Sequence, residues 1–428
     1  MTVSNPTIFA ISSGSPPAAI GVIRISGPEA GSALKALTQR EVRPRRASLA
    51  RLQSAKGDIL DEALVLWFPG PRTATGEDLA ELHCHGGRAV LAAVCDELGA
   101  MDGLRPALEG EFTRRSFANG RIDLSEAEGL ADLLEAETEL QRAAAIRNAS
   151  GKLSETVQEW RDKVLHLSAK VEAALDFSDE DDVSDLPAGF ADDVSDLAST
   201  LGEWLTRPRS ERLKDGFRVV LAGPPNSGKS TLFNALVESE AAITSPIAGT
   251  TRDVIERSVA IMGVPFVFAD TAGVRAEGAE EIEAIGIERA HRAFSEADCV
   301  LWLGAEGEGP EGAWEVAARQ DAADFVAKHE AVHTVSAETG LGLVSLKESL
   351  VNLAREALPK KGEATLNARQ HQRVGEAHEA LTSAGSMTDL LLIGEELRRA
   401  RLAFDRLIGR STTEDMLDAL FGRFCIGK

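Results

Sequence analysis

The sequence predicts a multidomain protein that combines α/β and all-α parts, and three observations support this fold class. Short apolar runs separated by turns fill residues 1–120. Apolar residues at four-three spacing dominate residues 121–212, and helical patterns return in residues 359–428. Strand-like and helix-like segments alternate in residues 213–358. We therefore expect an α+β N-terminal domain and a helical bundle made of two blocks, with an α/β domain inserted between the blocks.

The N-terminal domain contains three runs with the apolar character of strands. They are Ile20–Ile25, Ala63–Phe68 and Leu79–His83. Ala89–Leu98 instead predicts a helix.

The first helical block is predicted from two patterns. Ser125 and Glu128 have the spacing of a capping box in front of an apolar-periodic run. Further on, a stripe in strict four-three spacing predicts one long amphipathic helix, which needs another helix to bury it. The stripe consists of Leu153, Val157, Trp160, Val164, Leu167, Val171 and Ala174. The acidic stretch Asp176–Asp182 favours a solvated charge cluster over a metal site.

Composition excludes several classes of protein. The net charge of −22 argues against a broad basic face for nucleic acid, because such binding depends on neutralising phosphates. The five arginines within Arg40–Arg51 form either a local basic patch or a solvated loop. No secretory signal or bilayer-length apolar run is visible. Cys84, Cys95, Cys299 and Cys425 have neither disulfide nor zinc spacing, so we expect a cytoplasmic protein without membrane association.

The stretch Gly223-Pro-Pro-Asn-Ser-Gly-Lys-Ser230 fits the phosphate-binding pattern G-x-x-x-x-G-K-[ST]. Phe217–Leu221 predicts a strand before it, and Ser230–Val237 predicts a helix after it. Backbone N–H groups of such a loop wrap the α- and β-phosphates of a nucleotide. Lys229 would reach the β- and γ-phosphates, and the Ser230 hydroxyl would occupy one Mg²⁺ position. This order of strand, loop and helix favours nucleotide binding over a chance glycine turn.

Three later segments narrow the nucleotide to GTP. Gly249–Asp253 has the place of a switch segment that puts a threonine on Mg²⁺. Asp270–Gly273 has the D-x-x-G pattern that faces the metal ion and the γ-phosphate. Ser336-Ala337 matches the loop that backs a guanine base. Their order and spacing predict a Ras-like P-loop GTPase domain.

The base-reading motif N-K-x-D is altered. After a strand predicted at Ala323–Val326, the sequence reads Ala327-Lys-His-Glu330. Glu330 would replace the usual aspartate, and Ala327 removes the asparagine side chain. We expect guanine affinity to be weaker by about 1–3 kcal/mol for a lost polar contact.

Catalysis requires a group that orients the attacking water. Ras-like enzymes use a glutamine directly after the D-x-x-G glycine, where this sequence has Val274. A monovalent cation held by Asn226 and switch carbonyls would supply positive charge, unless Asn226 only forms a turn. The glutamates that follow Val274 closely are Glu277, Glu280, Glu281 and Glu283.

Signature segments along the whole chain resemble the MnmE (TrmE) family of tRNA modification GTPases. Besides the Asn226 loop and the two switch segments, they are Gly21–Gly27, Thr75–Gly87, Gly110–Arg121, Ile285–Ala290 and the terminal Phe424–Lys428. The resemblance implies a K⁺-stimulated GTPase that forms a homodimer. With a flavin-dependent MnmG-like partner, such an enzyme installs a carboxymethylaminomethyl or aminomethyl group at the 5-position of the tRNA wobble uridine.

The resemblance also implies roles for individual residues of the nucleotide domain. Ser230 and Thr251 would hold Mg²⁺. Glu283 would orient water, with Glu281 as the fallback. The implied K⁺ positions are Asn226, Ser245, Ile247 and Thr250. The implied GTP-binding residues are Asn226, Ser227, Gly228, Lys229, Ser230, Thr231, Ser245, Pro246, Ile247, Ala248, Gly249, Thr250, Thr251, Asp270, Thr271, Ala272 and Gly273.

The N-terminal domain resembles folate-binding domains, and the implied ligand is 5-formyltetrahydrofolate, the one-carbon donor. Its matching positions are Arg24, Glu81, Arg121 and Lys428. Guanidinium and carboxylate groups suit the glutamate tail and the pterin of a folate. Without the resemblance, Arg24 and Glu81 would predict a surface salt bridge. Cys425 is a candidate nucleophile by analogy with other uridine-modifying enzymes, or a packing residue.

Two other functions stay open at this point. The first is a GTP-driven switch in RNA or ribosome assembly without chemistry of its own, which would leave residues 1–120 and the C-terminal signature unexplained. The second is a folate-dependent one-carbon enzyme that GTP regulates.

Overall fold

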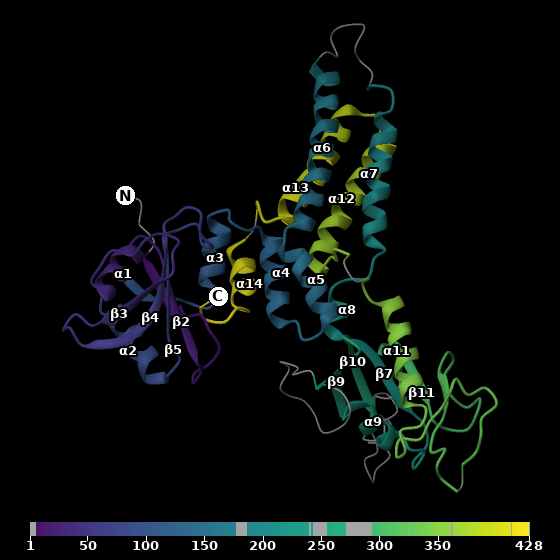
Figure 1. Ribbon diagram of the computed structural model, residues 1–428. Coiled ribbons are helices and arrows are strands. Elements are labelled where there is room, and N and C mark those ends of the chain that lie inside the picture. Colours follow the sequence, from purple (N-terminus) through teal and green to yellow (C-terminus); the bar gives the residue numbers. More distant parts are fainter. Residues whose placement is uncertain are drawn as a thin grey trace, which may run out of the picture. The chain divides into compact units, whose positions relative to one another are not determined.

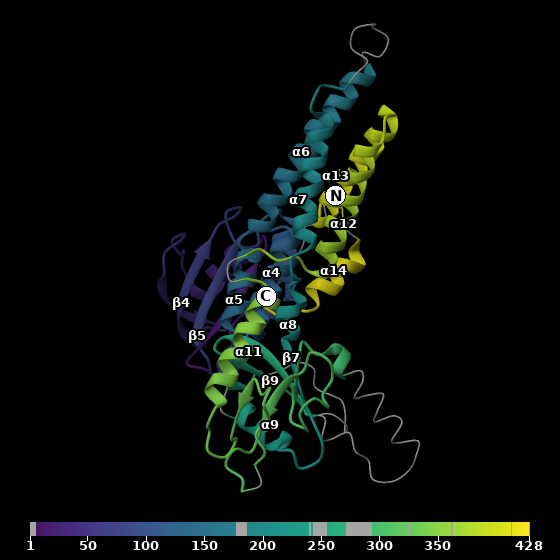
Figure 2. The same cartoon turned by 90° about the vertical axis from the view of Figure 1, so that its right-hand side faces the viewer.

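The computed structural model describes residues 6–176, 186–238, 241–242, 255–270, 293–323, 325–360, 363–411 and 413–427. The chain divides into two compact units (Figures 1 and 2). Unit 1 comprises Met1–Ala131 together with Asp405–Lys428, and unit 2 comprises Asp132–Phe404.

Unit 1 contains a six-stranded sheet with the order β3-β4-β5-β2-β1-β6. All neighbouring strands are antiparallel except β1 and β6, which are parallel. The strands are β1 (Thr7–Ile11), β2 (Ile20–Ser26), β3 (Ser48–Gln53), β4 (Ile59–Phe68), β5 (Leu79–His85) and β6 (Leu104–Pro106). The three predicted strands are therefore confirmed as parts of β2, β4 and β5.

Helices α1 (Ala30–Thr38) and α2 (Arg88–Gly99) pack on this sheet and confirm the predicted helix at Ala89–Leu98. Alternate residues of the strands, such as Ile23 and Leu82, join Leu34 and Leu91 of the helices in one buried core. Burying one such aliphatic side chain contributes about 1.5–3 kcal/mol.

The end of the chain is part of unit 1. Helix α14 (Glu414–Phe421) packs against α3 (Glu111–Ala118). Helix α4 (Leu124–Glu135) begins in this unit, and its Leu124 and Ala127 share a core with Phe421 and Phe424. Gly110 has φ +63°, and a Cβ there would clash with the Phe421 carbonyl oxygen. Glycine thus allows the close approach of α3 and α14.

The start of α4 corrects one prediction. The reciprocal bonds of a capping box are made by Asp123 and Glu126: the Asp123 N–H donates to Glu126 Oε2 over 2.7 Å, and the Glu126 N–H donates to Asp123 Oδ1 over 2.9 Å. Ser125 is instead buried, and its hydroxyl donates to the Leu407 carbonyl over 3.4 Å. The box therefore lies two residues before the predicted Ser125–Glu128 pair.

Unit 2 contains a bundle of long helices that run side by side in Figures 1 and 2. They are α6 (Lys152–Asp176), α7 (Phe190–Leu205), α12 (Ala368–Ser386) and α13 (Leu390–Leu407), with the shorter α5 (Glu139–Ala149) nearby. Every residue of the predicted stripe on α6 is buried. Trp160 of this stripe meets Trp204 edge-on at 5.3 Å between ring centroids. Of the stretch Asp176–Asp182, residues 177–182 lie outside the described residues.

The two helical blocks pack together, as predicted, because α7 and α12 lie in extensive contact. The Asn148 side chain also donates to the Thr365 carbonyl over 3.2 Å. The α/β part is thus inserted between the blocks in sequence. No helix among the described residues has the length and hydrophobicity needed to cross a membrane.

The inserted part holds a seven-stranded sheet in the order β13-β12-β11-β7-β10-β9-β8. Strands β7 and β10 to β13 are parallel, and β9 and β8 are antiparallel additions at one edge. The strands are β7 (Phe217–Ala222), β8 (Ala241–Ala242), β9 (Ile255–Ile261), β10 (Val264–Asp270), β11 (Cys299–Trp302), β12 (Trp314–Ala317) and β13 (His333–Thr334). Among the described residues, this part also has the helices α8 (Glu211–Asp215), α9 (Lys229–Val237) and α11 (Leu343–Ala357).

Candidate functional site

The predicted phosphate loop connects β7 to α9, as its sequence pattern requires. Gly223 has φ +147°, and a Cβ there would lie 3.0 Å from the backbone nitrogen of Gly304. Asn226 and Gly228 adopt φ values of +61° and +93°, in the left-handed region that few side chains favour. The loop is therefore shaped by its backbone, as a cradle of N–H groups must be.

Lys229 lies buried at the start of α9. Its ammonium group donates to the carbonyl oxygens of Gly223 over 2.9 Å and of Pro224 over 2.7 Å. The side chain thus folds back along its own loop. Phosphate oxygens bound in the loop would be stronger acceptors for this ammonium group, because they carry negative charge.

The structure brings Ser230 and Asp270 together, as predicted. Strands β7 and β10 are parallel neighbours, so Asp270 at the end of β10 lies opposite Leu221, beside the loop. The Ser230 hydroxyl donates to Asp270 Oδ2 over 2.7 Å. Hydroxyl and carboxylate oxygens are the hard ligands that Mg²⁺ prefers, so the pair suits a magnesium site at this end of the sheet.

The structure offers a candidate base-reading loop earlier in the chain than the predicted one. Strand β12 leads directly into Ala318-Arg319-Gln320-Asp321. The Gln320 N–H donates to the Val335 carbonyl over 3.1 Å, so this loop lies against the Ser336 loop. A hydrogen bond with the Ser336 hydroxyl lowers the pKa of the exposed Asp321 carboxyl, because it favours the charged form.

This loop also reaches the phosphate loop. Arg319 Nη1 donates to the Asn226 carbonyl over 3.4 Å, and a Cβ on Gly228 would lie 3.1 Å from the Arg319 side chain. The last position of the four-residue loop is an aspartate, as in N-K-x-D, while Ala318 and Arg319 replace the asparagine and the lysine. Asp321 and Arg319 are functional candidates that the sequence analysis missed.

The strand predicted directly before Ala327–Glu330 is wrong, so the assignment of the base loop to these residues loses its structural support. Among the described residues of the predicted strand at Ala323–Val326, none lies in a strand. Lys328 is half-buried, and its ammonium group donates to Glu315 Oε2 over 2.6 Å and to the Trp302 carbonyl over 3.0 Å. The Glu330 N–H donates to the Glu306 carboxylate. The segment 327–330 is therefore held against strands β11 and β12 by these contacts.

Several predicted positions lie outside the described residues. In the switch segments and near them, these are Ser245, Pro246, Ile247, Ala248, Gly249, Thr250, Thr251, Thr271, Ala272, Gly273, Glu281 and Glu283, and at the C-terminus Lys428.

In unit 1, the predicted pair Arg24 and Glu81 occupies facing positions of β2 and β5. Arg24 Nη2 lies 3.0 Å from Glu81 Oε1, and the guanidinium lies 5.8 Å from the centre of the Phe112 ring. His83 Nε2 lies 3.4 Å from Glu81 Oε2, is buried, and makes no hydrogen bond with any residue that the structure describes. A cation, a carboxylate and an imidazole nitrogen thus gather beside an aromatic ring, which suits a ligand with a flat polar ring and an acidic tail.

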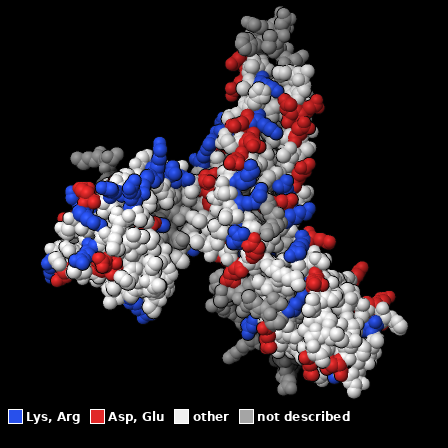
Figure 3. Space-filling model, in the orientation of Figure 1, with Lys and Arg blue, Asp and Glu red and all other residues white. Residues whose placement is uncertain are grey.

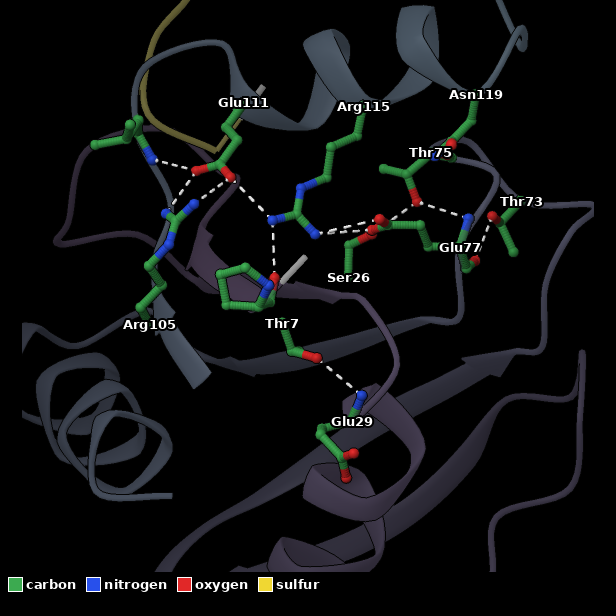
Figure 4. A network of polar contacts seen from close by, with 12 residues as sticks. Thr7, Ser26, Glu29, Thr73, Thr75, Glu77, Arg105, Glu111, Arg115 and Asn119 are labelled. Carbon is green, nitrogen blue, oxygen red and sulfur yellow. Dashed lines mark hydrogen bonds and ion pairs between the residues drawn. The ribbon is translucent and has the colours of Figure 1, made fainter. Parts of the chain in front are cut away.

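A buried ionic network supports this region (Figure 4). Arg115 Nη1 lies 3.0 Å from Glu77 Oε2, and Arg115 Nη2 lies 2.9 Å from Glu111 Oε1. Glu77 Oε2 also accepts from the Ser26 hydroxyl over 2.8 Å. Arg115 is 5% exposed, so removing either glutamate would leave its buried charge with a single carboxylate partner, which is destabilising. The network ties the segment around Glu77 to β2, which carries Arg24.

The third predicted ligand, Arg121, lies at the same segment. Its Nε donates to the Thr73 carbonyl over 3.1 Å. Gly76 adopts φ +78° at this place, and a Cβ there would lie 3.3 Å from the Arg121 side chain. Arg121 is thus placed by the loop that precedes β5, while Arg24 and Glu81 are placed by the sheet.

The C-terminal signature also docks on unit 1. The Ser12 hydroxyl donates to the Gly427 carbonyl over 2.8 Å, and Ile426 forms a bridge with Glu109. Gly427 has φ +99°, and a Cβ there would clash with the Ile11 carbonyl oxygen. Cys425 is exposed on this docked tail, whereas burial raises the pKa of the Cys84 thiol to about 12. Of these two thiols, only Cys425 is open to a substrate.

Two family models together match nearly the whole chain. Residues 124–425 match the MnmE helical domain, and residues 7–121 match the model described as GTP-binding protein TrmE N-terminus. The tRNA modification GTPase MnmE of Erythrobacter litoralis is 62% identical over 422 residues, which cover 99% of this chain and 100% of that protein. The protein of the same name from Novosphingobium aromaticivorans is 59% identical over 434 residues, with 99% of each chain covered. The chain therefore belongs to the MnmE (TrmE) family of tRNA modification GTPases.

Proposed function

We propose that this chain hydrolyses GTP to drive the modification of tRNA at the 5-position of the wobble uridine. A homodimer acts with a flavin-dependent MnmG-like partner and installs a carboxymethylaminomethyl or aminomethyl group. The one-carbon unit comes from 5-formyltetrahydrofolate. The observation that carries the proposal is that one chain combines a complete phosphate and base loop pair in unit 2 with the Arg24–Glu81 site in unit 1.

In the nucleotide site, separate residues bind the phosphates, the metal ion and the base. The N–H groups of the loop from Gly223 bind the phosphates, and Lys229 neutralises their charge. Ser230, Asp270 and the predicted switch residue Thr251 would hold Mg²⁺, which supplies charge stabilisation at the transferred phosphate. Asp321 accepts the N–H donors of guanine.

The cation and water positions are proposed on the resemblance. Asn226, with Ser245, Ile247 and Thr250, would hold K⁺, and Asn226 lies in the phosphate loop itself, where its backbone is left-handed. Glu283 would orient the attacking water, because Val274 neither donates nor accepts a hydrogen bond.

Glu283→Ala is expected to slow GTP turnover by about a hundredfold or more, since a group that positions or deprotonates the reacting water contributes at least that much. Nucleotide affinity should stay near that of the wild type, because the residue acts on water. Single-turnover hydrolysis by the wild type and the variant, each in K⁺ and in Na⁺, measures the effect of Glu283 and the effect of the cation. We expect hydrolysis to be slower in Na⁺. Unchanged turnover would remove Glu283 from this role, and equal rates in the two salts would remove the K⁺ site.

Arg24→Ala is expected to weaken 5-formyltetrahydrofolate binding by about tenfold to a hundredfold, because a charged hydrogen bond contributes about 1.5–3 kcal/mol. Arg51→Ala is a matched control: Arg51 also faces a glutamate across two strands, with Nε 3.7 Å from Glu62 Oε1, but that pair is solvent-exposed. Calorimetry on both variants measures the difference. Equal folate affinity in the two variants would exclude Arg24 from the site.

Wobble nucleosides from a strain that lacks this gene test the whole pathway. The modified uridine should be missing there and should return when the wild-type chain is supplied. If the wild-type chain binds no reduced folate and the uridines of the deletion strain are normal, the favoured function becomes a GTP-driven switch in RNA or ribosome assembly.

A further inference from the structure

Positive charge is concentrated in one part of an acidic chain. Residues 1–121 contain 14 Lys and Arg against 13 Asp and Glu, although the whole chain has a net charge of −22. Figure 3 shows blue side chains gathered along one edge of unit 1. Five arginines in two neighbouring loops define what we call the arginine surface: Arg40, Arg43, Arg45, Arg46 and Arg72.

Arg45 joins the two loops. It adopts φ +58°, and its N–H donates to the Trp67 carbonyl over 2.8 Å. Its guanidinium donates to the Arg72 carbonyl over 2.6 Å and lies 5.9 Å from the centre of the Phe68 ring. A non-glycine residue in this backbone region costs free energy, so surrounding contacts must hold it. The loop after α1 is thus fixed to the segment after β4, and this contact places Arg72 beside Arg45.

Besides Arg45, Arg40 also makes a backbone contact, since its guanidinium donates to the Leu49 carbonyl. All five are exposed, and none forms an ion pair with a carboxylate in the described part of the chain. The neighbouring acidic groups already have partners, since Glu41 pairs with Lys35 and Glu62 with Arg51. The arginine surface therefore has loops that are fixed to each other and positive charge that no described carboxylate neutralises. A loop that is merely solvated would need neither feature.

We propose that the arginine surface docks the phosphate backbone of the tRNA substrate. The inference rests on the proposed function, which requires tRNA to meet unit 1. Guanidinium groups bind phosphate oxygens in a planar, two-pronged geometry and are weakly hydrated, so five arginines without a lysine favour a phosphodiester backbone. The segment of Arg72 continues to Thr73, which accepts from Arg121, and to Thr75, which bonds Ser26 of β2 over 2.7 Å. Backbone bound at the surface would hold the RNA beside the proposed folate site.

The test uses the full chain with three arginines removed, R43A/R46A/R72A. A matched control, R142A/R398A/R399A, removes the same charge from exposed helical arginines that pair with glutamates one turn away. A third variant, R43K/R46K/R72K, keeps the charge and controls for folding of the loop. Binding of tRNA is measured at several salt concentrations without nucleotide and without folate.

The R43A/R46A/R72A variant should bind tRNA at least about tenfold more weakly. The slope of log affinity against log salt concentration should also become shallower by up to about two to three units, because each phosphate contact contributes about 0.9 to this slope. The lysine variant and the control should keep the steep dependence. GTP hydrolysis should be the same in all four proteins, which separates this proposal from the nucleotide site.

Three results would overturn the docking surface. The first is a wild-type chain with no salt-dependent tRNA binding, and the second is equal slopes in R43A/R46A/R72A and the control. The third is that the arginines are needed for binding to vesicles of phosphatidylserine but not to tRNA, which would assign the surface to an anionic membrane. If the wild-type chain binds no reduced folate and wobble uridines are normal in the deletion strain, the proposed function is refuted while the RNA-binding result stays in place.

Discussion

Asp321→Asn is expected to reduce GTP affinity by about a hundredfold or more and to make XTP the preferred nucleotide. The carboxylate of Asp321, whose pKa is lowered by a hydrogen bond with Ser336, would accept from the N1–H and the amino group of guanine. The asparagine amide would place its own N–H donor against the N–H donors of guanine, so hydrogen bonds are lost. Each lost hydrogen bond to a charged group costs about 1.5–3 kcal/mol. Xanthine has an oxygen in place of the amino group and can accept from the amide. Competition binding with GTP, XTP and ATP measures the change.

Glu330→Gln provides the matched control for this experiment. Its carboxylate occupies the place that the sequence pattern first indicated, but its N–H is bonded to Glu306, in the segment that Lys328 fastens to Glu315. The variant should therefore keep the wild-type preference for GTP. A switch toward XTP in Glu330→Gln, with none in Asp321→Asn, would return the base-reading role to Glu330.

Ser230→Ala is expected to lower GTP turnover by about a hundredfold or more, because the metal ion stabilises the developing charge on the transferred phosphate by several kcal/mol. The variant removes one of two oxygen groups that lie 2.7 Å apart at the end of the sheet. A titration of turnover with Mg²⁺ should show that much higher metal concentrations are needed.

Ser230→Thr keeps the hydroxyl and should retain most of the activity, since the phosphate-loop pattern accepts either residue. It therefore distinguishes loss of the oxygen ligand from a disturbed helix start. If Ser230→Ala responds to Mg²⁺ like the wild type, the metal site has been assigned to the wrong residue.

Local patterns were predicted well because their causes are local. The phosphate loop requires a strand, a glycine-rich turn and a helix in immediate succession, and the sequence from Phe217 to Val237 contains all three. The stripe on α6 follows from helical periodicity alone. The ion pair of Arg24 with Glu81, which these residues predict without the resemblance, follows from the register of β2 and β5.

The missed features depend on contacts between distant segments. Strand β12 has four residues and includes Glu315, so it lacks the apolar run that marked β7 and β10. The Asp at position 321 could have been found from its spacing after that strand, but Ala323–Val326 looked more apolar. The docking of Gly427 beside Ile11 and Ser12 joins the two ends of the chain, and no local pattern predicts such a contact.

The central claim is that one site binds Mg²⁺ through Ser230 and Asp270 and reads guanine through Asp321. The most direct test is hydrolysis of GTP and of ATP by the full wild-type chain, at equal concentrations, with and without Mg²⁺. The account predicts rapid cleavage of GTP in Mg²⁺, little cleavage of ATP, and little cleavage of either without the metal ion. Equal cleavage of GTP and ATP, or cleavage of GTP that persists when Mg²⁺ is removed, would contradict it.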